Sequence, residues 1–81
     1  MTLRYTERFE RQYRTLTEQL KAKVDKQLRL LTENPRHPSL RAKKYDEARG
    51  VWQARVDRRY RFYFQLQDDT CVLLSVIPHP K

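Results

Sequence analysis

The stretch Gly50-Val-Trp-Gln-Ala-Arg-Val-Asp-Arg-Arg-Tyr-Arg-Phe-Tyr-Phe-Gln-Leu66 decides the fold of this 81-residue chain. Apolar and polar residues alternate on either side of Asp57-Arg58-Arg59, which predicts strands over 51–56 and 60–66 joined by a tight turn. A register slip of one residue would place apolar side chains opposite polar ones. The pattern therefore predicts one hairpin with a well-specified register.

The alternation gives this hairpin two chemically different faces. The apolar face, which we expect to meet the rest of the core, carries Trp52, Ala54, Val56, Tyr60, Phe62, Phe64 and Leu66. The polar face carries Gln53, Arg55, Asp57, Arg61, Tyr63 and Gln65. In the expected register Arg55 lies directly opposite Arg61, with Cβ atoms about 5 Å apart. Like charges so placed destabilise a hairpin, so the pair favours a bound anion, and guanidinium groups suit a phosphate.

Other residues extend this candidate site. Tyr63 is a surface on which a base could stack, and Gln53 shares the polar face. Arginines at the turn and lysines before the hairpin would extend this positively charged surface along the backbone of a bound nucleic acid. These residues are Arg58, Arg59, Lys43 and Lys44. The alternative is that Arg61 pairs with Asp57 or another carboxylate, that Arg55 is merely solvated, and that Tyr63 is an ordinary exposed sheet residue.

The charge and the length of the chain limit the classes of function that it can have. The chain has 18 Lys and Arg against 10 Asp and Glu, a net charge of +8, and residues 35–61 hold nine of the basic but three of the acidic groups. Such a concentration indicates a polyanion partner, although a solvated basic face is the alternative. At 81 residues the chain forms one domain, 1–81, which excludes a multi-layer enzyme.

The remaining elements complete an α+β fold. Leu3 and Tyr5 predict a short opening strand, and Thr6 and Thr17 predict the starts of two helices that end near residues 16 and 34. Residues 35–40 form a loop because they contain two prolines. Strands are expected over 41–45 and 71–77. The order is β-α-α-β-β-β, an antiparallel sheet with both helices packed on one face.

Several classes of site and location are not expected. The chain lacks an apolar run of 18 residues and a signal-peptide core, which predicts a soluble, cytoplasmic protein with no membrane partner. The chain has a single cysteine, Cys71, and two histidines that lie far apart in the sequence. We therefore expect no disulfide, no metal site and no other cofactor. Histidine titrates near neutrality, so His79, and less strongly His37, is a candidate for proton transfer.

The hairpin, together with Asn34-Pro-Arg-His-Pro-Ser-Leu40 before it and Leu73-Leu-Ser-Val-Ile-Pro-His79 after it, resembles the RelE/ParE superfamily of bacterial type II toxins. The resemblance is greatest to RelE-like mRNA interferases and covers nearly the whole chain. It implies a microbial-RNase-type fold that enters the ribosomal A site and cleaves mRNA without a metal. It also implies three partners: the ribosome, mRNA and a cognate antitoxin protein.

The resemblance further implies residue roles. Arg55 and Arg61 would stabilise the transition state as the ribose 2′-hydroxyl attacks the adjacent phosphate, and His79 would be a general acid or base. Gln53 stands where some relatives have a lysine. Two alternatives remain: a ParE-like toxin that poisons DNA gyrase by protein binding, and a degenerate member that only binds an antitoxin or RNA.

Overall fold

The β3–β4 hairpin forms in the expected register. β3 (Val51–Arg55) pairs antiparallel with β4 (Tyr60–Gln67), and the pairs run from Val51 opposite Gln65 to Arg55 opposite Arg61. The computed structural model describes residues 1–79. Its other elements are β1 (Thr2–Tyr5), α1 (Glu7–Arg14), α2 (Glu18–Glu33), the 3-10 helix η1 (Pro38–Leu40), β2 (Lys43–Asp46) and β5 (Thr70–Pro78).

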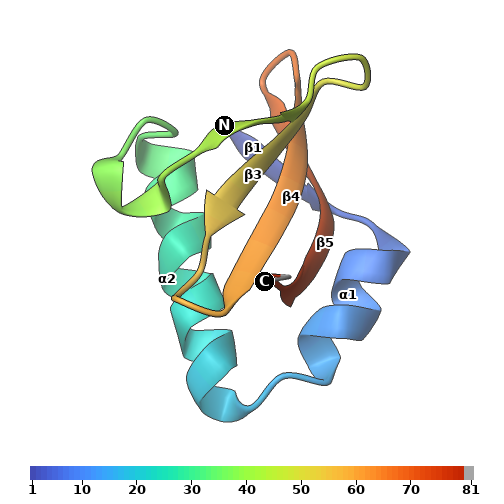
Figure 1. Ribbon diagram of the computed structural model, residues 1–81. Helices are drawn as coiled ribbons and strands as arrows, with labels where there is room; N and C mark the ends of the chain where they lie inside the picture. The colour runs from blue at the N-terminus through green and yellow to red at the C-terminus, as the bar shows by residue number, and fades with distance from the viewer. Residues whose placement is uncertain (80–81) are drawn as a thin grey trace.

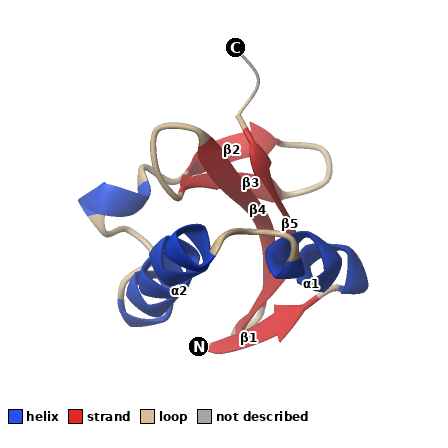
Figure 2. Ribbon diagram, turned by 90° about the horizontal axis from the view of Figure 1, so that it is seen from below, coloured by secondary structure: helices blue, strands red, loops and turns tan. Residues whose placement is uncertain are grey.

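The five strands form one sheet in the order β1-β5-β4-β3-β2, with both helices on the same side (Figures 1 and 2). The expected α+β class and element order are confirmed. One detail differs, because β1 runs parallel to β5, with Leu3 opposite Cys71, which makes the sheet mixed. The chain between these two parallel neighbours includes both helices, η1 and the strands β2 to β4, which is long enough for a parallel pairing.

Threonine caps begin both helices, as the sequence predicts. The Thr6 hydroxyl accepts a hydrogen bond from the Phe9 N–H at 3.2 Å, and the Thr17 hydroxyl accepts one from the Leu20 N–H at 3.1 Å. Thr6 also donates to the carbonyl of Leu73 on β5 at 2.8 Å. This bond ties the start of α1 to the sheet.

The core lies between the helices and the apolar face of the hairpin. Its fully buried members include Phe9, Val24, Leu31, Leu40, Phe62, Phe64, Leu73 and Val76. The predicted division of the hairpin faces is confirmed, although Leu66 on the apolar face is 42% exposed and Gln53 and Tyr63 on the polar face are buried. Cys71 is also a core residue, and burial raises the pKa of its thiol to about 12.

The segment before the hairpin differs from the expected strand over 41–45. β2 begins only at Lys43, because Arg41 adopts a left-handed conformation with φ +46° at the end of η1. A bulge follows between Lys44 and Asp46. No helix within residues 1–79 is both long and apolar enough to cross a membrane.

Candidate nucleic-acid interface

The two arginines lie together on the face of the sheet that the helices leave open. Arg55 and Arg61 are cross-strand partners, and both line a cavity of about 300 Å³. The other residues that line it are Arg41, Lys43, Gln53 and His79. Among residues 1–79, the lining holds four permanent cations and no carboxylate, so the cavity favours an anion.

Backbone carbonyl groups hold the guanidinium of Arg61. Its Nη1 donates to the carbonyl oxygen of Asp57 at 2.6 Å and to that of Tyr60 at 3.0 Å. Within residues 1–79, neither Arg55 nor Arg61 forms an ion pair with a carboxylate. The Asp57 carboxylate therefore does not neutralise Arg61.

The Asp57 carboxylate instead organises the turn. It accepts hydrogen bonds from the backbone N–H groups of Arg59 and Tyr60, both at 2.8 Å, and its other oxygen lies 3.4 Å from Lys23 Nζ on α2. Burial alone would raise the pKa of Asp57, but these hydrogen bonds and the Lys23 ammonium outweigh it and lower the pKa below its ordinary value. The turn that precedes Arg61 is thereby joined to α2.

A buried amide on the same helix holds two further segments of the cavity together. Gln27, 6% exposed, donates through Nε2 to the carbonyl of Arg55 at 2.8 Å and to that of Ser39 at 3.2 Å. The Ser39 hydroxyl donates back to the Gln27 carbonyl at 3.3 Å. Since Arg41 follows Ser39 by two residues, Gln27 joins the segments that carry two of the cavity's arginines.

Arg41 is the site residue that the sequence analysis missed. A non-glycine residue in the left-handed region is uncommon and is strained by about 1–3 kcal/mol, and such residues cluster at functional sites. Its N–H donates to the Pro38 carbonyl at 3.2 Å, which closes η1. The only available signal was its place in the most basic third of the chain, because nothing local marks a positive φ at an arginine.

His79 is brought to the cavity from the far end of the chain. Its backbone N–H donates to the carbonyl of Arg59 in the turn, and its side chain lines the cavity with Arg55 and Arg61. His37 lies elsewhere, where its Nδ1 accepts from the Ser39 N–H at 3.1 Å. Within residues 1–79, no three His, Cys, Asp or Glu side chains are grouped to hold a metal ion.

Four other predicted RNA-binding residues have mixed placements. Lys43 lines the cavity, but Lys44 lies on the opposite face, with its ammonium 4.7 Å from the centre of the Trp52 ring. Arg58 and Arg59 are exposed in the turn and do not line the cavity. Lys44 therefore does not extend the open-face patch, because strand alternation turns it toward the helix side.

Tyr63 is not the open stacking surface that the sequence predicted. It is 6% exposed, its hydroxyl accepts from Gln53 Nε2 at 2.9 Å, and the ring of Tyr45 lies 4.8 Å from its own. Gln53 is also buried, at 5% exposed, and reaches the cavity as one of its lining residues. Tyr45 covers Tyr63, and the alternation of apolar and polar residues along the strands does not predict that contact.

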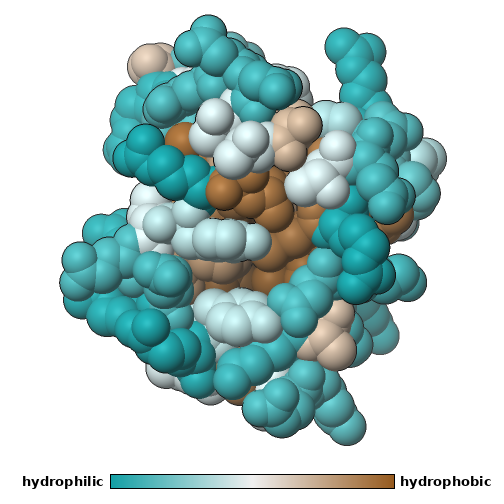
Figure 3. Space-filling model, turned by 180° about the vertical axis from the view of Figure 1, so that it is seen from behind, coloured by the Kyte–Doolittle hydropathy of each residue, from teal (hydrophilic) through white to brown (hydrophobic). Residues whose placement is uncertain are grey.

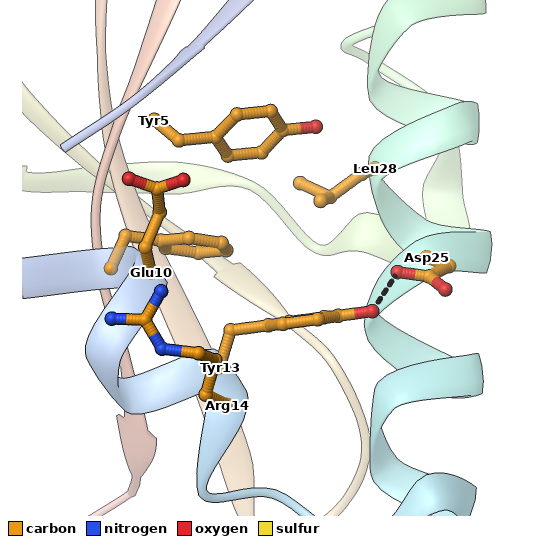
Figure 4. A pocket seen from close by; sticks show the side chains of 7 residues that line it. Tyr5, Glu10, Tyr13, Arg14, Asp25 and Leu28 are labelled. Atoms are coloured by element: carbon orange, nitrogen blue, oxygen red, sulfur yellow. Dashed lines mark hydrogen bonds between the residues drawn. The ribbon is translucent and has the colours of Figure 1, made fainter. Parts of the chain in front are cut away.

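A second hollow lies on the helix side, between α1 and α2, where a hydrophobic floor shows between hydrophilic rims (Figure 3). Its volume is about 270 Å³, and the Tyr13 hydroxyl donates to Asp25 across it at 2.8 Å (Figure 4). Burial and this hydrogen bond raise the pKa of Tyr13 to about 12. Its charged lining is mixed, with Glu10, Arg14 and Asp25, so it lacks the single sign of the arginine cavity.

Solved structures with the same fold include several toxins. The chain is 15% identical to a YoeB/ParE toxin from Agrobacterium tumefaciens, with a TM-score of 0.82 over 99% of this chain and 100% of that one. It is 28% identical to a chain of the toxin-antitoxin complex RelBE2 from Mycobacterium tuberculosis, with a TM-score of 0.77 over 96% of each chain. For the E. coli RelBE toxin-antitoxin complex the identity is 19% and the TM-score 0.76, over 99% and 98%.

No curated protein matches the chain. A family model does match, over residues 3–80, and it describes the ParE toxin of the type II toxin-antitoxin system parDE. This match spans the sheet, both helices and the arginine cavity. The chain therefore belongs to the ParE toxin family, within the RelE/ParE superfamily of type II toxins.

Proposed function

We propose that this toxin is an endoribonuclease that cleaves mRNA in the ribosomal A site. The observation that carries the proposal is the cavity in which Arg55 and Arg61 oppose each other with His79 beside them. A pair of guanidinium groups suits the phosphate of a polynucleotide, and within the described part of the chain no lining carboxylate competes for the two charges. The basic charge of residues 35–61 supports an RNA partner.

The proposed reaction is an internal transesterification. The ribose 2′-oxygen bonds to the adjacent phosphorus, and the bond from phosphorus to the 5′-oxygen of the next nucleotide breaks. The 2′-hydroxyl proton passes to a base and the leaving 5′-oxygen gains a proton, with His79 in one of these roles. Arg55 and Arg61 stabilise the charge that develops on the phosphoryl oxygens, and the step itself needs no metal.

Cleavage should be mapped directly on translating ribosomes. Induction of the protein is expected to give mRNA ends phased with codons. Purified protein that has been treated with EDTA and then freed of the chelator is expected to cleave mRNA on ribosomes in magnesium buffer as well as untreated protein does. Arg61→Ala is expected to reduce cleavage about 10²- to 10³-fold, whereas Arg29→Ala, on the exposed side of α2, should cut like the wild type. Equal toxicity of Arg61→Ala and wild type would contradict the proposal.

A second candidate function is poisoning of DNA gyrase by protein binding. The observation that favours it is the family model, which is that of ParE rather than RelE toxins. In that case induction should trigger DNA-damage signalling while mRNA remains intact. For either function we propose a cognate antitoxin as partner, since the similar structures include toxin-antitoxin complexes from E. coli and M. tuberculosis.

A further inference from the structure

Tyr45 is the most exposed large aromatic side chain among residues 1–79, at 62%. It sits at the β2 bulge, where Lys44 pairs with Trp52 and Asp46 pairs with Val51, so Tyr45 has no partner of its own on β3. Bulges redirect side chains and occur often beside functional sites. Here the bulge places two consecutive residues, Tyr45 and Asp46, on the open face of the sheet.

A chain of contacts connects Tyr45 to the arginine cavity. Its ring packs edge-on against buried Tyr63, with 4.8 Å between ring centres, and the Tyr63 hydroxyl accepts a hydrogen bond from Gln53, which lines the cavity. Tyr63 and Arg61 lie two residues apart on one strand face, about 7 Å. The exposed ring of Tyr45 thus packs on a residue that neighbours the proposed phosphate site.

Tyr45 forms one wall of an open hollow of about 370 Å³ on this same face. The apolar part of the lining comes from Tyr45, Val51, Tyr63, Leu74 and Ile77. Arg8 and Arg49 add positive charge to it, and the one acidic group, Asp46, lies 3.8 Å from Arg49. Arg61 pairs with Ile77 across β4 and β5, so the hollow adjoins the arginine cavity.

We propose that this hollow binds a nucleobase of single-stranded RNA, stacked on Tyr45, while the neighbouring phosphate lies between Arg55 and Arg61. The assignment to RNA rests on the function proposed above. Proteins that bind single-stranded nucleic acids combine a surface on which a base stacks with a cationic site for the backbone. The exposed Tyr45 ring and the adjacent arginine cavity provide these two features. The positive groups around the hollow complement that same polyanion.

The binding of a fluorescein-labelled single-stranded RNA about ten nucleotides long tests the proposal by fluorescence anisotropy at low salt. Tyr45→Ala should weaken binding about 5- to 100-fold, because a stacked base is lost, while Tyr45→Phe should bind like the wild type. The salt dependence of affinity should be unchanged in Tyr45→Ala, since no phosphate contact is removed. Tyr5→Ala is the matched control, because Tyr5 is 44% exposed but lies in the groove on the helix side.

A probe without bases separates stacking from backbone binding. With an abasic oligomer of the same length, wild type and Tyr45→Ala should have equal affinity. If Arg61→Ala weakens RNA binding but Tyr45→Ala does not, the base site is wrong and the phosphate site stands. If the wild-type protein binds neither RNA nor ribosomes, the proposed function itself fails. If Tyr45→Ala lowers only the affinity for a protein partner, the hollow is a protein-binding surface and the proposal is overturned.

Discussion

The two faces of the β3–β4 hairpin come from alternate residues of the same two strands, yet different forces determine them. The inner face is closed over by α1 and α2 and is held by burial, as Phe62 and Phe64 illustrate at 0% and 1% exposed. The outer face places Arg55 against Arg61, a contact that weakens the hairpin. The comparison indicates that the inner face serves folding, and it agrees with our proposal that the outer face binds an anionic ligand.

The largest expected effect on stability is on the inner face. Phe62→Ala removes a fully buried ring and should lower the free energy of unfolding by about 3–5 kcal/mol, a large part of the stability of a domain of this size. Urea denaturation followed by circular dichroism measures the loss. A loss below about 1 kcal/mol would mean that the inner face is not the main source of stability.

Loss of the Gln27 hydrogen bonds, which connect α2 to the segments that carry Arg41 and Arg55, should have the next largest effect on stability. Gln27→Met keeps most of the packing but leaves the carbonyls of Arg55 and Ser39 without their donor, which should cost about 1–3 kcal/mol of stability. It should also weaken RNA binding, because Arg41 and Arg55 are no longer held together. Val24→Ala, a buried change on the same helix, is the control that should lose stability without this specific loss of affinity.

The turn should show a pH-dependent effect. The pKa of Asp57 is lower in the folded protein than its ordinary value of 3.8, so its contribution is present above about pH 4 and is lost as the pH falls through the lowered folded value. Asp57→Asn should cost about 1 kcal/mol at neutral pH and should flatten the stability profile at acid pH. Thermal denaturation from pH 2 to pH 7 checks this, and parallel wild-type and variant profiles would contradict it.

The smallest expected effect on stability is on the outer face, and its sign is opposite. Arg55→Thr removes one of two opposed like charges and should stabilise the hairpin by up to about 1 kcal/mol, while it should abolish toxicity. The measurement is the denaturation midpoint together with growth after induction. A variant that is clearly destabilised would show that the pair is structural rather than functional.

Alternation and capping explain how much of the fold the sequence predicts. The register that opposes Arg55 to Arg61 follows from a period of two, and both helix starts follow from Thr6 and Thr17. The parallel pairing of β1 does not follow, because Leu3 and Cys71 are 68 residues apart and share no local signal. Pairing across such separations is set by the packing of the whole domain.

The sequence predicted five of the six residues that line the arginine cavity. They lie on or just after regular strands and are Lys43, Gln53, Arg55, Arg61 and His79. Arg41 needs a positive φ that no neighbouring glycine announces. Tyr45 needs a bulge, and that bulge determines which of two tyrosines is covered. The parts of the site that the sequence did not predict therefore lie on irregular backbone, whose conformation depends on tertiary contacts.

The salt dependence of RNA binding tests the opposed arginines most directly. For single-stranded nucleic acid, the slope of log affinity against log salt changes by about 0.7 for each phosphate neutralised. If Arg55 and Arg61 each contribute one such contact, replacing both with glutamine should make the slope about 1.4 units shallower than that of the wild type. An unchanged slope in a folded double variant would contradict the account, because the two guanidinium groups would then not be binding the RNA backbone.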